Sequence, residues 1–149
     1  MIRVAIIGTG NISGAHISAY LAFPDRCRIT ALCDIYPEKA EEKKSKYGLT
    51  ADVVDAHEKL LEREDIDLVS ICTPPFCHAE IAVNFLKAGK NVIVEKPMAA
   101  SLEECDQIIA ASKESGKTLA VIAQNRFKDP VMKLKGVLDS GKIGRVLHA

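Results

Sequence analysis

Short apolar runs alternate along the chain with longer segments in which apolar residues recur at helical spacing. The runs lie at residues 2–7, 29–33, 51–54, 67–72, 91–94 and 118–123. Near-continuous apolar runs are typical of strands buried on both faces of a parallel sheet. Because the segments between the runs read as helices, the pattern predicts an α/β fold with a doubly wound parallel sheet.

The segments between the runs also carry helix boundary signals. Pro37 and Gly48 bound a charged segment, as expected for the start and the end of a helix. Capping boxes are predicted at residues 55–58 and 101–104. Four periodic sets of residues predict helices. Two of them recur at helical spacing or on one face, namely Ile12, His16, Ala19 and Phe23, and Ala79, Ala82, Val83 and Leu86. The other two are expected to be buried or to face inward, namely Leu102, Cys105, Ile108 and Ile109, and Val131, Leu134 and Leu138.

A glycine turn joins the first run to the first helix. Gly8 would allow the tight turn, and Gly10 would let the backbone approach a pyrophosphate that faces the free N–H groups of the helix start. The third position of the G-x-G-x-x-G pattern is Ser13, which is small enough for close packing, with Gly14 one place later. Any tight strand-to-helix turn favours glycine, so a purely structural turn remains open on this motif alone.

An acidic residue follows the second run at the spacing that a ribose-binding group requires. Asp34 lies 20 residues after Gly14, where a carboxylate at the tip of the second strand accepts from the ribose hydroxyls of adenosine. The alternative is a turn or helix-cap aspartate before Pro37. Together with the glycine turn, Asp34 predicts a Rossmann-like dinucleotide site.

Composition narrows the class of protein and of partner. The 149 residues suit one domain, and Lys plus Arg and Asp plus Glu both number 20, so no nucleic-acid partner is expected. The apolar runs are far shorter than the roughly 20 residues that span a bilayer, and the first run leaves no room for a signal peptide, so we expect no membrane association. The five cysteines show no C-x-x-C spacing, so we expect reduced thiols, a cytoplasmic location and no metal site.

Polar or proline-rich groups follow the predicted strands at residues 8–12, 34, 73–78, 95–97 and 124–126. The carboxyl ends of parallel strands meet at one edge of a sheet, and ligands of such sheets bind there. We therefore expect these five groups to surround one site.

These groups together resemble the N-terminal domain of the glucose-fructose oxidoreductase, inositol dehydrogenase and rhizopine-catabolism (Gfo/Idh/MocA) family. The most specific segments are T-P-P-F-C-H at 73–78 and A-G-K-N-V-I-V-E-K-P at 88–97, and G-K-I-G-R-V-L-H-A at 141–149 resembles the crossing into the family's second domain. The resemblance implies a dinucleotide-binding Rossmann domain over residues 1–125. Residues 126–149 would then be the connecting helix and first strand of a substrate domain that is otherwise largely absent.

The resemblance also implies a function. Family members are nicotinamide-dependent dehydrogenases and reductases that act on sugars, cyclitols and related polyols, so it implies NAD as cofactor and a small sugar-like substrate. Lys96 resembles the family's active-site lysine, which would donate to the substrate oxygen, and the Lys96 to Pro97 bond is expected to be cis. The implied cofactor-binding residues are Gly8, Thr9, Gly10, Asn11 and Ile12 for the pyrophosphate, Asp34 and Ile35 for the adenosine, Thr73, Pro74 and His78 for the cleft wall, Glu95 and Lys96 near the nicotinamide, and Asn125.

The family's second domain supplies the usual catalytic histidine, and His16, His57, His78 and His148 do not replace it. We therefore expect a fragment that binds dinucleotide with slow turnover or none. An unpaired strand at residues 145–149 would present an open edge through which a homo-oligomer could form.

Charge favours NAD over NADP. A 2′-phosphate placed about 5 Å from Asp34 would cost on the order of 3 to 6 kcal/mol at an effective dielectric near 20. Lys39 or Lys43 could instead read that phosphate, so NADP remains the alternative. Two other function classes also remain: a non-catalytic dinucleotide-binding or sensor module, and a methyltransferase, which likewise places an acidic residue after its second strand.

Overall fold

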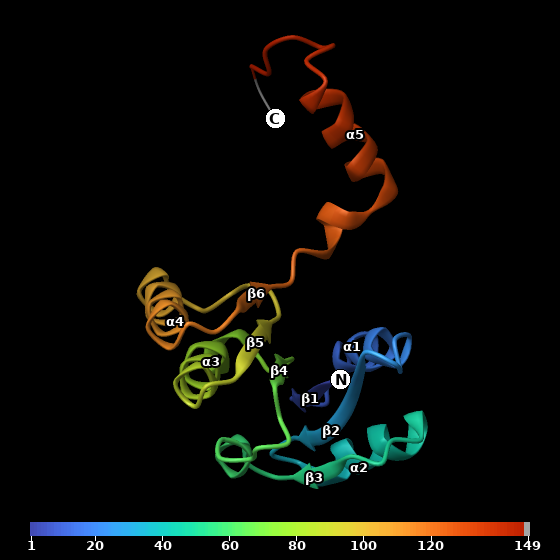
Figure 1. Cartoon of the computed structure of the whole chain (residues 1–149), viewed down its shortest axis with the longest axis vertical. Helices are drawn as coiled ribbons and strands as arrows, with labels where there is room; N and C mark the ends of the chain where they lie inside the picture. The colour runs from blue at the N-terminus through green and yellow to red at the C-terminus, as the bar shows by residue number, and fades with distance from the viewer. Residues whose placement is uncertain (148–149) are drawn as a thin grey trace.

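The computed structural model describes residues 1–147 and contains a six-stranded parallel sheet with helices on both faces (Figure 1). The strand order is β3-β2-β1-β4-β5-β6, so the predicted doubly wound sheet is confirmed. The strands are β1 Ile2–Ile7, β2 Cys27–Cys33, β3 Asp52–Val54, β4 Leu68–Ile71, β5 Asn91–Val94 and β6 Leu119–Val121.

Helices α1 and α2 cover one face of the sheet, and α3 and α4 cover the other (Figure 1). The helices are α1 Ser13–Leu21, α2 Pro37–Tyr47, α3 His78–Lys87, α4 Leu102–Ser115 and α5 Asp129–Asp139, with short 3-10 helices η1 His57–Leu60, η2 Pro75–Cys77 and η3 Gln124–Phe127.

Side chains of β1 alternate between two apolar cores. Val4 and Ile6 pack with the α1 and α2 side, whereas Ala5 and Ile7 pack with the α3 and α4 side. Because helices cover both faces of the sheet, residues that point to either face contact apolar neighbours. This explains why the strands read as unbroken apolar runs.

The two predicted capping boxes have different outcomes. The Ser101 side chain accepts from the Glu104 N–H, and the Glu104 side chain accepts from the Ser101 N–H, so the box before α4 is confirmed. The box at residues 55–58 was wrong, because η1 has no side-chain cap. The Asp55 carboxylate instead pairs with Lys59 at 2.6 Å.

The buried faces of α1 and α4 agree only in part with the periodic residues of the sequence, since His16 and Ile108 are buried but several others are not. In α1 the buried residues are Ser13, His16 and Ile17, while Ile12, Ala19 and Phe23 are exposed. In α4 the buried residues are Ile108 and Ala111, while Leu102 and Ile109 are exposed. Ile17 and Ile108 are the large apolar residues buried here, so the spacing of apolar residues alone did not identify the whole buried face. The stripe predicted for α3 is largely confirmed, with Phe85 as its largest buried member.

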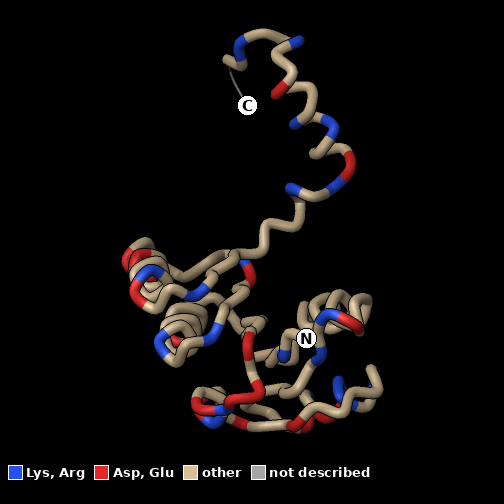
Figure 2. Tube along the Cα trace, in the orientation of Figure 1, with Lys and Arg blue, Asp and Glu red and all other residues tan. Residues whose placement is uncertain are grey.

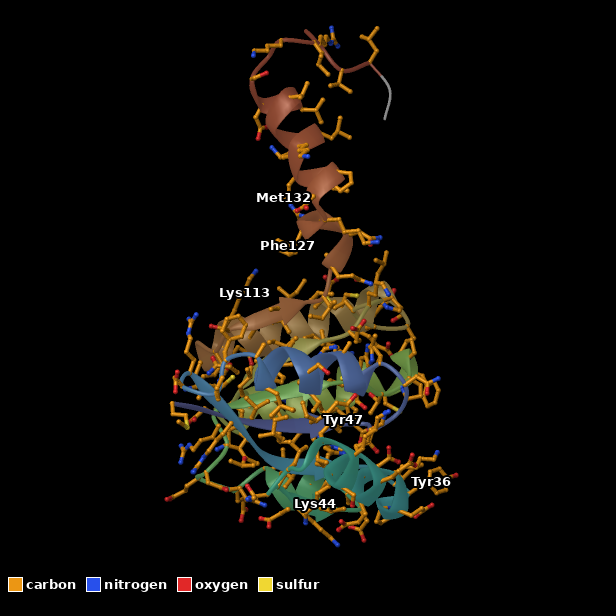
Figure 3. The ribbon with its side chains drawn as sticks, turned by 90° about the vertical axis from the view of Figure 1, so that its right-hand side faces the viewer. Tyr36, Lys44, Tyr47, Lys113, Phe127 and Met132 are labelled. Carbon is orange, nitrogen blue, oxygen red and sulfur yellow. The ribbon has the colours of Figure 1, made fainter. Side chains whose placement is uncertain are left out.

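Helix α5 extends away from the sheet, and Phe127 and Met132 lie on this projecting part (Figures 1 and 3). The helix was predicted correctly, but Val131 and Leu134 are exposed rather than inward-facing. The structure assigns no strand to residues 145–147, and residues 148 and 149 of the predicted strand lie outside the described residues.

Charged residues of both signs are interspersed along the described chain (Figure 2). Arg3 and Asp67 form a two-pronged pair at the amino ends of β1 and β4, with nitrogen–oxygen distances of 2.9 and 2.7 Å. Asp67 also accepts from the Arg3 backbone N–H at 2.8 Å. Within residues 1–147, no helix has the length and apolar character needed to cross a membrane.

We expect Phe85→Ala to lower the free energy of unfolding by about 3–5 kcal/mol, because it leaves a cavity between α3 and the sheet. Chemical denaturation followed by circular dichroism measures this change. The control is Leu102→Ala, since the Leu102 side chain is 81% exposed, and it should change stability by no more than about 0.5 kcal/mol. Equal effects of the two substitutions would contradict the described core.

Asp67→Asn should destabilise the chain in a pH-dependent manner. The hydrogen bond from the Arg3 side chain holds the pKa of the Asp67 carboxyl well below its usual range, against a smaller opposing effect of burial. A lowered folded pKa means that the stabilisation is present above the unfolded value of about 3.9 and is lost as pH falls below it. The difference in urea midpoint between the wild type and Asp67→Asn should therefore be full at pH 7 and shrink below about pH 4. Asp25→Asn, at an exposed position, is the control. A difference for Asp67→Asn that stayed constant over this pH range would refute the pairing.

Candidate functional site

A cleft of about 670 Å³ opens over the carboxyl ends of β1, β2 and β4. The cleft lies at the point where the strand order reverses. There β1 lies between β2, the next strand in the chain, and β4. Of the residues predicted to bind cofactor, six line it: Gly8, Gly10, Asp34, Ile35, Thr73 and Pro74. A smaller hollow of about 200 Å³, near Tyr20, Arg28 and Leu49, contains none of them.

The glycine turn brings the start of α1 against the end of β4. Gly8 has φ +86°, and a Cβ there would lie 2.9 Å from backbone atoms of Cys72 and Thr73, so no other residue fits without displacement. A Cβ on Gly10 would meet nothing within 4 Å, which leaves open room above the turn. The Ser13 hydroxyl donates to the Gly10 carbonyl at 2.7 Å and so closes the turn.

The third position of the glycine pattern is shared between two residues. Ser13 is fully buried, as its predicted packing role requires. A Cβ on Gly14 would lie 2.8 Å from the Tyr47 hydroxyl, and Tyr47 lies between α2 and α1 (Figure 3). Both Ser13 and Gly14 are therefore small residues that allow α1 to pack closely.

The start of α1 carries no side-chain cap and no acidic residue in its first turn. By contrast, α2, α3, α4 and α5 each carry an acidic residue there. The free N–H groups and the positive end of the helix dipole therefore face the open space above Gly10 without a competing carboxylate. Asn11 and Ile12 are exposed beside them.

Asp34 is anchored at the tip of β2 as a carboxylate. Its Oδ2 accepts from the Thr9 backbone N–H and from the Thr9 hydroxyl, both at 2.8 Å, and its Oδ1 accepts from the Tyr36 N–H at 3.0 Å. Burial by itself would raise the pKa of the Asp34 carboxyl, but these hydrogen bonds and the nearby Lys39 outweigh it and hold the pKa below its usual value. A fixed negative charge thus stands in the wall of the cleft.

Exposed apolar side chains line the same cleft as this carboxylate. Ile35 follows β2 and is 77% exposed, and Phe76 follows β4 and is 71% exposed. Both line the cleft, and so does His57, whose side chain is mostly covered and whose ring lies 6.0 Å from that of Phe85. Such surfaces suit a flat aromatic ligand group. Phe76 and His57 were missed from the sequence, although Phe76 lies inside the T-P-P-F-C-H segment.

Thr73 contributes an unpaired hydroxyl. Its Oγ1 is buried and has no hydrogen-bond partner among the described residues, although a buried hydroxyl without a partner costs about 1–3 kcal/mol. Thr73 lines the cleft, so a bound polar ligand could satisfy it.

Two cysteines in the cleft wall are chemically quiet. Burial raises the pKa of the Cys33 and Cys72 thiols to about 12. Both thiols therefore remain protonated at neutral pH and do not act as nucleophiles there.

His78 lies behind the cleft wall rather than on it, which corrects the prediction that it lines the cleft. The side chain is fully buried. Its two ring nitrogens lie 2.9 Å from the Pro97 carbonyl oxygen and 2.8 Å from the Thr73 carbonyl oxygen. His78 therefore joins the segment after β4 to the segment after β5.

Glu95 and Lys96 follow β5, and the Lys96 to Pro97 bond is cis as predicted. Lys96 is exposed, whereas Glu95 is buried and its carboxylate lies 3.0 Å from the His16 ring. Neither residue lines the described cleft, and both lie at the same carboxyl edge of the sheet. Asn125 lies exposed on η3 and does not line the cleft.

Known proteins are similar to this chain in sequence and in fold. The inositol 2-dehydrogenase of Salmonella typhimurium (strain LT2) is 30% identical over 147 residues, which are 98% of this chain and 44% of that protein. The WlbA dehydrogenase from Bordetella pertussis, solved in complex with NADH and UDP-GlcNAcA, has a TM-score of 0.92 at 30% identity, covering 97% of this chain and 42% of that one. A levoglucosan dehydrogenase in complex with NADH and levoglucosan has a TM-score of 0.90 at 31% identity, covering 98% and 41%.

The chain thus spans less than half the length of these relatives. Residues 2–123 match a family model described as an oxidoreductase family with an NAD-binding Rossmann fold. This match covers the glycine turn, Asp34, Thr73 and the segment with Lys96. The chain therefore belongs to the Gfo/Idh/MocA oxidoreductase family, through its NAD-binding Rossmann domain.

Proposed function

We propose that the cleft holds NAD with its adenosine beside Asp34 and its pyrophosphate above Gly10 at the start of α1. The observation that carries the proposal is that one cleft contains the Asp34 carboxylate, the open space at Gly10 and the unpaired Thr73 hydroxyl. The carboxylate would accept from the ribose hydroxyls. Ile35 and Phe76 would flank the adenine.

We propose Lys96 as the residue that acts on the substrate. Bound NAD would supply a hydride acceptor or donor at its nicotinamide ring. The exposed Lys96 ammonium, at the end of β5, would donate to the oxygen of a secondary alcohol or ketone and favour the negative charge that develops there. Relatives named as inositol and levoglucosan dehydrogenases support a sugar or cyclitol as substrate.

We also propose that residues 126–149 connect the dinucleotide-binding domain, residues 1–125, to a second domain that completes the substrate site. The exposed apolar side chains of Phe127, Val131 and Met132 on the projecting segment support this division. The relatives extend well beyond the matched length. This chain alone would then bind cofactor without efficient turnover.

NAD is favoured over NADP because the Asp34 carboxylate would repel a 2′-phosphate. Lys39 argues in the other direction, since it lines the same cleft and its ammonium lies 4.3 Å from the Tyr36 ring centre. Asp34 is held by three hydrogen bonds, so its charge is fixed, whereas Lys39 stands on a flexible stem. The fixed charge should decide the preference.

Calorimetric titration of the chain with NADH, NADPH and S-adenosylmethionine tests the proposed function. We expect NADH to bind most tightly and Asp34→Ala to weaken it by about 10-fold or more, since hydrogen bonds to a charged group contribute about 1.5–3 kcal/mol. The same substitution should narrow the difference between NADH and NADPH. Asp106→Ala, at an exposed position on α4, is the matched control. Tighter binding of NADPH would overturn the cofactor preference, and preferential binding of S-adenosylmethionine would overturn the function.

Thr73→Val should separate stability from binding. It removes a buried hydroxyl that has no partner among the described residues, so the free chain should be as stable as the wild type or more stable. NADH affinity should fall about 3- to 10-fold if the cofactor satisfies that hydroxyl. Thermal unfolding without ligand and NADH titration measure the two effects, with Thr118→Val on the remote β6 side as control. Unchanged affinity would exclude Thr73 from the cofactor contacts.

A further inference from the structure

Three polar side chains from separate elements meet beneath the carboxyl edge of the sheet. His16 comes from α1, Ser70 from β4, and Glu95 directly follows β5. His16 is 9% exposed, Glu95 6% and Ser70 not at all. The His16 Nδ1 lies 2.8 Å from the Ser70 Oγ, and the His16 Nε2 lies 3.0 Å from the Glu95 Oε1.

Hydrogen-bond chemistry sets the direction of these contacts. Burial by itself would raise the pKa of the Glu95 carboxyl, but the hydrogen bonds from His16 and from the Lys96 N–H outweigh it and hold the pKa below its usual value. An ionised Glu95 can only accept, so Nε2 donates to it. The Ser70 hydroxyl can then donate to Nδ1 of a neutral ring, which leaves every member paired.

The second oxygen of Glu95 carries the network to the proposed catalytic lysine. The Lys96 backbone N–H donates to Glu95 Oε2 at 3.0 Å. His16 therefore fixes one carboxylate oxygen while the other fixes the main chain at Lys96. The same helix that carries His16 begins at the glycine turn.

From this geometry we propose that His16 is a positioning residue, which acts through Glu95 to set the Lys96 segment relative to α1. This role rests on the proposed NAD site. In that site, the His16 side chain would fix the position of the nicotinamide end relative to the pyrophosphate end. Deleting His16 would leave adenosine and pyrophosphate contacts in place and loosen the nicotinamide end.

The same three residue types also occur in hydrolase triads, but the geometry here excludes that use. The Ser70 side chain is fully buried within β4, so its Oγ cannot reach a substrate. In a hydrolase triad the serine faces Nε2 and the acid faces Nδ1, whereas here the two partners are exchanged.

A role in stability alone is also a weaker explanation. A buried hydrogen bond contributes little net stability, because its polar groups lose their hydration when they are buried. The next residue, Ile17, is buried on the same helix by apolar contacts alone. The hydrogen bond from His16 fixes the orientation of the Glu95 carboxylate, and this explains why the buried position is polar.

Two amide substitutions separate the two contacts of the ring. His16→Gln can place a donor near the position of Nε2 and so keep the contact with Glu95, whereas His16→Asn can reach only toward Ser70. Binding of NADH and of ADP-ribose, which lacks the nicotinamide, is measured for both variants and for His16→Leu. We expect NADH affinity to fall about 10-fold in the Asn and Leu variants and to be largely retained in the Gln variant. ADP-ribose affinity should change in none of them by more than about twofold.

Ile17→Val controls for loosened packing of α1, and it should leave the ratio of NADH to ADP-ribose affinity unchanged. In a Glu95→Gln background, His16→Leu should have little further effect on NADH, because His16 acts through Glu95. Equal weakening of both ligands, or a Gln variant as weak as the Asn variant, would show a structural role only and overturn the proposal. A wild-type chain that binds neither ligand would refute the NAD site itself, and the positioning role with it.

Discussion

The close approach of two backbone segments at the centre of the sheet is the constraint on which the remaining structure depends. A Cβ on Gly8 would lie 2.9 Å from backbone atoms of Cys72 and Thr73, so the turn after β1 rests directly on the end of β4. These neighbouring strands are separated in the chain by β2 and β3, and the chain reverses its direction across the sheet between them. A side chain at Gly8 would push the turn away from β4 and disturb both walls of the cleft.

Much of the fold could be predicted from the sequence because strands that are buried on both faces appear as apolar runs. Each strand is an apolar run, and each helix boundary at Pro37, Gly48 and Ser101 has a local cause. The position of Asp34 was also predictable, since a strand end must be followed by a residue at the edge of the sheet.

The remainder could not be predicted because it depends on contacts between elements that are distant in the chain. Nothing near His16 indicates that it faces Glu95, which lies 79 positions later. His78 read as a cleft residue because its segment is one, but the turn of α3 directs its ring inward to the Pro97 carbonyl. The buried face of α1 depends on such contacts as well, since Ser13, His16 and Ile17 are buried whereas Ile12 and Phe23 are exposed.

The two buried histidines indicate a division of labour between apolar and polar contacts. Apolar packing is non-directional, so the two cores hold the sheet and helices together without fixing the segments that follow the strands. A hydrogen bond is directional within narrow limits, and His16 and His78 each tie a segment after β4 or β5 to another element. Buried polar groups are costly unless they are paired. His16 and His78 both lie at the carboxyl edge, so directional contacts fix the geometry where the proposed cofactor site lies. The opposite edge is held by the partly exposed pair of Arg3 and Asp67.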